Sequence, residues 1–318
     1  MHPVVTLVAR RVALGLILLW AASVLIFVGT TILPGDVAQA ILGQSATPVS
    51  LANLREELGL NEPALTRYLD WMGGVLRGDL GTALTNGEDI ATAMGRRLGN
   101  TLLLAGVAAA IAVPLALLLG IVAVRFRNRW PDRAISTVTL AAISVPEFLL
   151  GYLVIYLLAV QWRVFPSLAA VYDGMGWAET LNAIALPVIV LVLAVLGHMM
   201  RMTRAAILNV MQAPYIETAE LKGLRPIAVI ARHAFPNAVA PVVNVVTINL
   251  AFLVVGVVVV EVVFVYPGMG QYLVDHVSKR DVPVVQASGL VFAAVYIGLN
   301  LVADVVSILA NPRLRHPR

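Results

Sequence analysis

Three carboxylic acids lie inside long apolar stretches of the sequence, where an acidic side chain can act on a bound solute. Glu147 follows Pro146, Glu261 follows four consecutive valines, and Asp304 lies in the last apolar stretch. A charged group is costly in hydrocarbon and usually faces a protein interior or a water-filled path. Glu147, beside a proline, can contact a cationic or amino-terminal group of a ligand.

Each acid also has a structural explanation. Proline frees a backbone carbonyl and can kink a helix, so Glu147 can be turned toward neighbouring helices as a packing group. Glu261 can accept hydrogen bonds from loop backbone. Asp304, close in sequence to Arg313, can be a solvated or ion-paired residue at the end of its stretch.

The sequence offers no catalytic or metal-binding constellation. There are no cysteines, and the five histidines stand far apart at positions 2, 198, 233, 276 and 316. His198, between Gly197 and two methionines, has no second ligand at metal spacing, so we interpret it as structural. HExxH, GxSxG and Walker A patterns do not occur in the sequence. We expect no cofactor and no metal in this chain, and a polytopic membrane enzyme is only a remote alternative.

Composition places the chain in a membrane. Of its 318 residues 60% are hydrophobic and 13% charged, and the mean hydropathy is +0.89, whereas a soluble domain carries about a quarter charged residues. Six segments reach the roughly 20 apolar residues that a spanning helix needs: 12–33, 100–124, 134–160, 182–200, 237–265 and 284–309. The net charge of +4 comes from residues at the ends of these segments, without a nucleic-acid-binding patch.

The apolar segments divide the chain into three parts. The first segment, within 1–33, is longer than a signal-peptide core, so we expect a retained membrane anchor. Residues 34–99 form a polar, locally acidic loop, in which 51–58 and 64–76 are helix-compatible and 78–81 predicts a turn. This loop is either a structural cap or a landing surface for an external partner. Residues 100–318 hold the other five spans.

Lysine and arginine placement predicts the orientation, because cytoplasmic loops are enriched in both. Basic residues concentrate in the segments 125–133 and 201–232 and at both ends of the chain. The sequence therefore predicts that both termini are cytoplasmic and that 34–99 lies outside.

The predicted cytoplasmic loop 201–236 contains one short helix. Pro214 suits a first helical turn, Glu217 lies near the positive end, Lys222 near the negative end, and Gly223 can adopt the left-handed conformation that ends a helix. A helix of about ten residues is marginal in water and needs something to pack on.

One face of this helix has the profile of a docking surface. Tyr215, Thr218, Ala219 and Lys222 follow helical spacing, and the small residues Ala219 and Gly223 permit another backbone to approach closely. A helix of this kind fits a partner's groove.

The same segment resembles a known family. Glu217-Thr218-Ala219, then Gly223, then His233-Ala234-Phe235-Pro236 are similar in type and spacing to the EAA loop of permease subunits in binding-protein-dependent ABC importers. The resemblance implies a coupling helix that seats in a cleft of a cytoplasmic ATPase. The implied coupling residues are Tyr215, Glu217, Thr218, Ala219, Lys222, Gly223 and Pro236. Thr218 and Glu220 depart from the alanine and the basic residues that are frequent in the family.

Further motifs extend the resemblance over nearly the whole chain, to the dipeptide, oligopeptide and nickel permease group. They are the runs at 34–36 (PGD), 58–60 (LGL), 78–81 (GDLG), 266–270 (YPGMG), 280–286 (RDVPVVQ) and 311–313 (NPR). The resemblance implies an all-α type I importer permease fold with six transmembrane helices. It also places Glu261 near the outer part of the translocation pathway.

The resemblance implies an assembly in a bacterial inner membrane. It would contain a second, homologous permease, which favours a heterodimer, two cytoplasmic subunits that bind ATP and Mg, and an extracytoplasmic substrate-binding protein. Solute import would proceed by alternating access. Dipeptides or oligopeptides are the leading cargo, with nickel or opine-like solutes as alternatives and an ATP-independent channel as a remote one.

Overall fold

The computed structural model describes residues 3–32, 37–172 and 174–310, so the 34–36 and 311–313 motifs lie outside the described residues. The described part is helical apart from loops and one isolated bridge between Thr82 and Asp89. Helices dominate because an apolar chain in a bilayer must satisfy its backbone polar groups internally. The described residues fall into two compact units: those within 1–12, 102–266 and 298–318 form the first, and those within 13–101 and 267–297 form the second.

The second unit contains the helices of the polar loop and parts of three long helices. Its elements are α1 (Pro3–Ile32, from residue 13), α2 (Val37–Leu42), η1 (Gly43–Ser45), α3 (Pro48–Glu57), α4 (Ala64–Arg77), the start of α5 (Ile90–Arg125), α13 (Met269–Ser278) and most of α14 (Val282–Ala310). The expected helices at 51–58 and 64–76 are confirmed as α3 and α4. Gly78 ends α4 with a φ of 83°, as the expected turn requires.

Aromatic packing and hydrogen bonds hold the second unit together. Phe27 of α1 contacts Tyr68 and Trp71 of α4, with ring centroids 5.3 and 6.2 Å away. The amide of Gln286 on α14 donates to the Thr30 hydroxyl of α1 at 2.8 Å. The polar loop is therefore packed on membrane-inserted helices and not independent of them.

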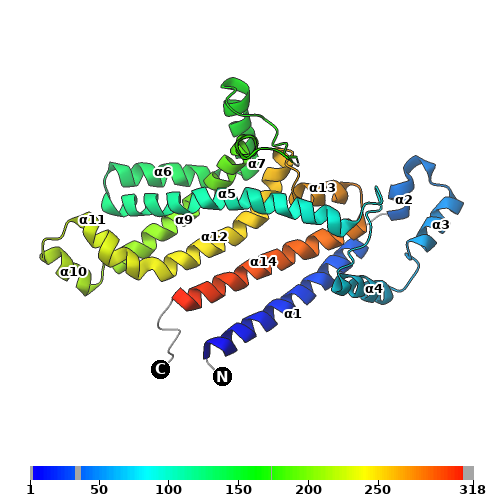
Figure 1. The fold of residues 1–318 in the computed structure, drawn as a ribbon, viewed down its shortest axis with the longest axis horizontal. Coiled ribbons are helices and arrows are strands. Elements are labelled where there is room, and N and C mark those ends of the chain that lie inside the picture. The colour runs from blue at the N-terminus through cyan, green and yellow to red at the C-terminus, as the bar shows by residue number, and fades with distance from the viewer. Residues whose placement is uncertain (1–2, 33–36, 173, 311–318) are drawn as a thin grey trace. The chain divides into compact units, whose positions relative to one another are not determined.

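The first unit is built around α9 (Figure 1). Its elements are the rest of α5, α6 (Trp130–Ser144), α7 (Glu147–Val154), η2 (Ile155–Gln161), α8 (Trp177–Ala183), α9 (Ala185–Val210), α10 (Pro214–Leu221), α11 (Pro226–Val229), η3 (Ile230–Ala234) and α12 (Phe235–Val263), together with short ends of α1 and α14. Helix α9 packs against α6, α7 and α12. It is buried on many sides for this reason.

Five described helices are long and apolar enough to cross a membrane: Val8–Ile32, Ile90–Arg125, Ala185–Val210, Pro226–Val254 and Val282–Val306. They correspond to five of the six expected spans. Three of these helices extend well beyond the expected bounds: α1 begins nine residues before 12, α5 begins ten residues before 100, and α9 continues ten residues past 200. The polar loops are correspondingly shorter than the ranges 34–99 and 201–236.

The third expected span, 134–160, is wrong as a single helix. The chain bends by 105° between α6 and α7, so the two form a broken pair. Val145 is extended, at φ −92° and ψ 129°, because the proline ring of Pro146 disfavours a helical conformation in the residue before it. Pro114 and Pro241 lie inside α5 and α12 without ending them. The break places Glu147 at the first position of α7.

A close crossing joins α6 and α9 at Gly197. A Cβ atom added at Gly197 would lie 2.6 Å from Ile143 Cγ2 and 2.7 Å from the backbone oxygen of Thr139. Backbone cannot yield as a flexible side chain can, so only glycine fits this contact.

We expect Gly197→Ala to lower the free energy of unfolding by roughly 1–3 kcal/mol, because the added methyl overpacks the crossing. The thermal unfolding temperature of the purified protein in detergent measures this. Gly106→Ala is the matched control, since nothing lies within 4 Å of the added carbon at Gly106 of α5. A Gly197→Ala protein as stable as Gly106→Ala contradicts the tight crossing.

Candidate functional site

Helix α10 forms as the sequence predicts. Pro214 occupies its first turn after an extended Ala213, and Glu217 lies in the positive first turn. Gly223 has a φ of 77°, and its amide donates to the Glu220 carbonyl at 2.9 Å. The predicted helical start and glycine stop are confirmed.

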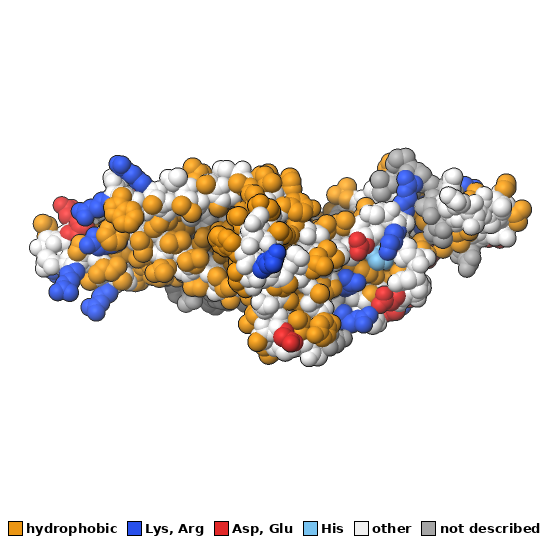
Figure 2. Space-filling model, turned by 90° about the horizontal axis from the view of Figure 1, so that it is seen from above, with side chains coloured by type: hydrophobic (Ala, Val, Ile, Leu, Met, Phe, Trp, Pro, Cys, Tyr) orange, Lys and Arg blue, Asp and Glu red, His pale blue; other side chains and the backbone are white. Residues whose placement is uncertain are grey.

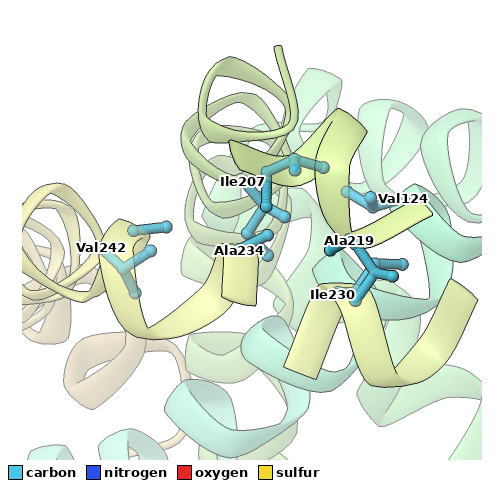
Figure 3. Close-up of a cluster of buried hydrophobic side chains, with 9 residues drawn as sticks. Val124, Ile207, Ala219, Ile230, Ala234 and Val242 are labelled. Atoms are coloured by element: carbon cyan, nitrogen blue, oxygen red, sulfur yellow. The ribbon is translucent and has the colours of Figure 1, made fainter. Parts of the chain in front are cut away.

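One side of α10 is buried in the protein's own core. Ile216 is 1% and Ala219 6% exposed, in a cluster with Val124 of α5, Ile207 of α9 and Ile230 of η3. Figure 3 shows Ala219 pointing toward Val124 and Ile230. This packing supplies the support that a two-turn helix lacks by itself.

The expectation that Ala219 shares an exposed docking face is therefore wrong. Ile216 and Ala219, three residues apart, face inward together. Tyr215, Glu217, Thr218, Lys222 and Gly223 are all exposed. The inward direction was readable from Ile216, the most apolar residue of the helix, and Ala219 had to follow it.

Four large apolar side chains are exposed around α10, and sequence reasoning missed three of them. Tyr215 is 46%, Leu221 82%, Leu224 41% and Ile227 48% exposed. We call these four residues the α10 apolar surface. Exposed apolar groups gathered in one short polar segment are typical of an interaction site.

Basic side chains surround this surface. Figure 2 shows Lys and Arg at the end of the first unit formed by α10, α11 and the α5–α6 connection, and hydrophobic side chains over much of the neighbouring face. The exposed basic residues in these segments are Arg127, Arg129, Arg133, Lys222, Arg225 and Arg232. Glu217 and Glu220 are the exposed acids of α10.

Pro236 lies at the other end of the motif, exposed in the first turn of α12. Ala234, two residues earlier, is fully buried in the cluster that holds α10. The Asn237 amide donates to the His233 carbonyl at 2.7 Å. The motif thus runs from an exposed helix into the base of a long apolar one.

An ion pair that sequence reasoning missed lies near this end of the unit. Arg204 of α9 donates to both carboxylate oxygens of Asp132, from Nε at 2.9 Å and from Nη2 at 2.8 Å. The backbone N–H of Asn128 also donates to Asp132 Oδ2, at 3.0 Å. Asp132 is 4% exposed. A bidentate pair of this kind fixes the start of α6 against α9.

Glu147 lines a cavity of about 550 Å³ between α6, α7, α9 and α12. Sequence reasoning interpreted His198 as structural, but its side chain is exposed and lines this same cavity. The two residues are far apart in sequence, and only the bend after α6 and the packing on α9 bring them to one cavity.

Glu261 is fully buried in α12 and does not line the cavity that contains Glu147. The Tyr266 amide donates to its backbone carbonyl at 2.8 Å. Burial, followed by the nearby Glu261 carboxylate, raises the pKa of Tyr266. Glu261 therefore lies inside the protein, and its place in the translocation pathway stays a prediction.

Asp304 was expected to be either solvated or ion-paired, and the structure shows an ion pair. Its carboxylate lies 3.0 Å from Arg11, a residue of α1 and not one of the nearby C-terminal arginines. Both side chains are partly exposed, so the pair contributes little to stability. Among the residues that the structure describes, no three His, Cys, Asp or Glu are grouped as metal ligands.

Comparison with known protein families decides the family. The model of the binding-protein-dependent transport system inner membrane component matches residues 90–316, and its N-terminal companion matches 4–105. The chain belongs to this family. As such it is a multi-pass protein of the bacterial inner membrane and a transport component.

Relatives of this permease match over nearly their full length. A Brucella abortus (strain 2308) protein named as a peptide transport system permease is 34% identical, over 98% of this chain and 99% of the relative. The glutathione transport system permease protein GsiC of Escherichia coli (strain K12) is 36% identical, over 95% and 97%. Among solved structures, an inward-facing MetNI methionine ABC transporter chain matches with a TM-score of 0.53 and 18% identity. That match covers 69% of this permease and 96% of the MetNI chain, and it supports the permease fold.

We expect Arg204→Lys to lower the free energy of unfolding by roughly 1–2 kcal/mol, because lysine keeps the charge but cannot form both hydrogen bonds of the bidentate pair. Thermal unfolding in detergent measures the change. Arg201→Lys, on the same helix but exposed, is the control, for which we expect a change within about 0.5 kcal/mol. Equal unfolding temperatures for the two variants contradict a stabilising role of the pair.

Proposed function

We propose that this permease is a membrane subunit of an ATP-driven importer for peptides or peptide-like solutes. The names of relatives similar over nearly their whole length, peptide and glutathione permeases, support this cargo class. Nickel and opine-like solutes stay alternatives. Membership of a transport family favours an importer over an enzyme.

The proposed assembly has a second, homologous permease, two ATPase subunits with their ATP and Mg, and an extracytoplasmic binding protein. Both termini of the permease would be cytoplasmic. The arginines and lysine around α10 support this orientation, since basic loops stay on the cytoplasmic side. The helices α2, α3 and α4 would then lie outside, where the binding protein delivers solute.

Helix α10 would be the coupling helix. The observation that carries this assignment is its two-sided environment. Ile216 and Ala219 anchor it in a core shared with α5, α9 and α12, while Tyr215 and Leu221 are exposed. A helix anchored on one side and apolar on the other can pass a partner's displacement to the spans.

The residues predicted to couple the permease to the ATPase then fall into two groups. Tyr215, Glu217, Thr218, Lys222 and Gly223 would face the ATPase, with Leu221, Leu224 and Ile227 added by the structure. Ala219 would act from inside by holding the helix, and Pro236 by starting α12. Closure of the ATPase pair would move α10 and drive alternating access.

We expect Leu221→Asp to weaken ATPase binding by roughly tenfold or more, because it places a charge in the centre of an apolar contact. ATP-driven solute uptake into proteoliposomes should fall in proportion. Retention of the ATPase on the affinity-purified permease measures the binding directly.

Leu76→Asp on α4 is the matched control for ATPase retention, since Leu76 is 81% and Leu221 82% exposed. Neither change should alter the unfolding temperature much, because both side chains are on the surface. ATPase retention by Leu221→Asp at the level of Leu76→Asp contradicts the coupling assignment.

A further inference from the structure

The cavity beside Glu147 has the composition of a solute site. Its volume is about 550 Å³, within the range of small-molecule sites. Side chains such as Leu191, Val195 and Phe252 make its walls apolar. Glu147 is the one acidic or basic residue among its lining residues apart from His198, and Asn249 adds an amide. A single charge in an apolar cavity fixes the orientation of a bound solute.

Glu147 is the first residue of α7, directly after the bend between α6 and α7. Both of its carboxylate oxygens would lie 3.3 Å from a Cβ added at Gly256 of α12. The absence of a side chain at Gly256 therefore leaves the room that the carboxylate occupies.

No described residue neutralises this carboxylate. It takes part in no hydrogen bond or ion pair within the part of the chain that the structure describes. The Asn249 amide donates to its own helix, to Val245 O at 2.8 Å. An ionised acid in such surroundings is costly until a cation or donor reaches it.

The nearest basic residues along α9 belong to another cavity. Arg201 and Arg204 line an adjoining space of about 480 Å³, which shares His198 and Met202 with the first. Arg204 is already paired with Asp132. The acidic position beside Gly256 is thus separate from the basic one.

We propose that Glu147 binds the ammonium group of a solute that passes through this cavity. The inference rests on the proposed import function and narrows its cargo to amine-bearing solutes, which include peptides with a free amino terminus. One carboxylate and one imidazole provide too few ligands for a tightly held metal ion. The ammonium group instead needs one anion and an apolar surround, and the cavity provides both.

The test measures binding to the permease assembled with its second permease and its ATPases, without the binding protein, so that selection by that protein is removed. The probes are dialanine and N-acetyl-dialanine, which differ in the charge of the amino terminus. We expect dialanine to bind the wild type, and N-acetyl-dialanine or the Glu147→Gln variant to lower the affinity roughly tenfold to hundredfold. Glu147→Asp should restore part of the preference for dialanine.

Glu179→Gln is the matched control, because Glu179 is exposed on α8 and does not line the cavity. If Glu147→Gln fails to assemble, Gly256→Ala replaces it, since its methyl displaces the carboxylate without removing it. The same preference for dialanine in the wild type and in the assembled variant overturns the proposal. So does a wild type that binds neither probe.

Uptake in proteoliposomes with ATP and the binding protein separates this proposal from the proposed function. ATP-driven uptake that is unaffected by Glu147→Gln leaves the importer function standing and overturns the ammonium site. Probe binding that depends on Glu147 without any ATP-driven uptake supports the site and overturns the importer function.

Discussion

The lipid bilayer offers no hydrogen-bonding partners, and the rest of the structure follows from that constraint. Every long apolar segment of the chain is helical, and irregular backbone lies between the spans or at one bend. Polar side chains inside the spans are few, and most have partners, as Asp132 and Arg204 do. Against this background a carboxylate without a partner, such as Glu147, stands out as a functional feature.

Two features of the first unit, the core around α10 and the cavity around Glu147, are supported by the same helices. The core that buries Ile216 and Ala219 draws residues from α5, α9, η3 and α12. Helix α9 also packs against α6 through Gly197 and against α7 beside the cavity. The segment proposed to receive the ATPase and the cavity proposed to receive the solute therefore share the same supporting helices.

The spans were predictable because apolar length is written directly in the sequence. Their ends were not, since α5 and α9 continue into residues such as Arg96 and Arg204, where the polar groups face water or a partner and cost the helix little. The bend at Val145 is larger than the kink that a proline alone produces, because the packing of α7 on α9 also contributes to it.

For the candidate site, the local sequence signals were sufficient to predict where α10 begins and ends. These signals did not indicate which side of α10 faces inward. The packing of Ala219 with Val124 and Ile230 in the structure shows it. The pairing of Asp132 with Arg204 and the meeting of Glu147 with His198 join residues distant in sequence. Spacing along one chain carries no information about such contacts.

Helix α12 connects the core around α10 with the cavity around Glu147. Its base, at Ala238, belongs to the core that holds α10, and farther along Asn249, Phe252 and Gly256 form a wall of the cavity. Gly256 lies 18 residues beyond Ala238, which is roughly 27 Å at 1.5 Å per residue. Tilting a rod of this length by about 6° shifts its far end by roughly 3 Å, close to the width of a water molecule. Under the coupling role proposed for α10, a tilt of this size in α12 would change the space around Glu147.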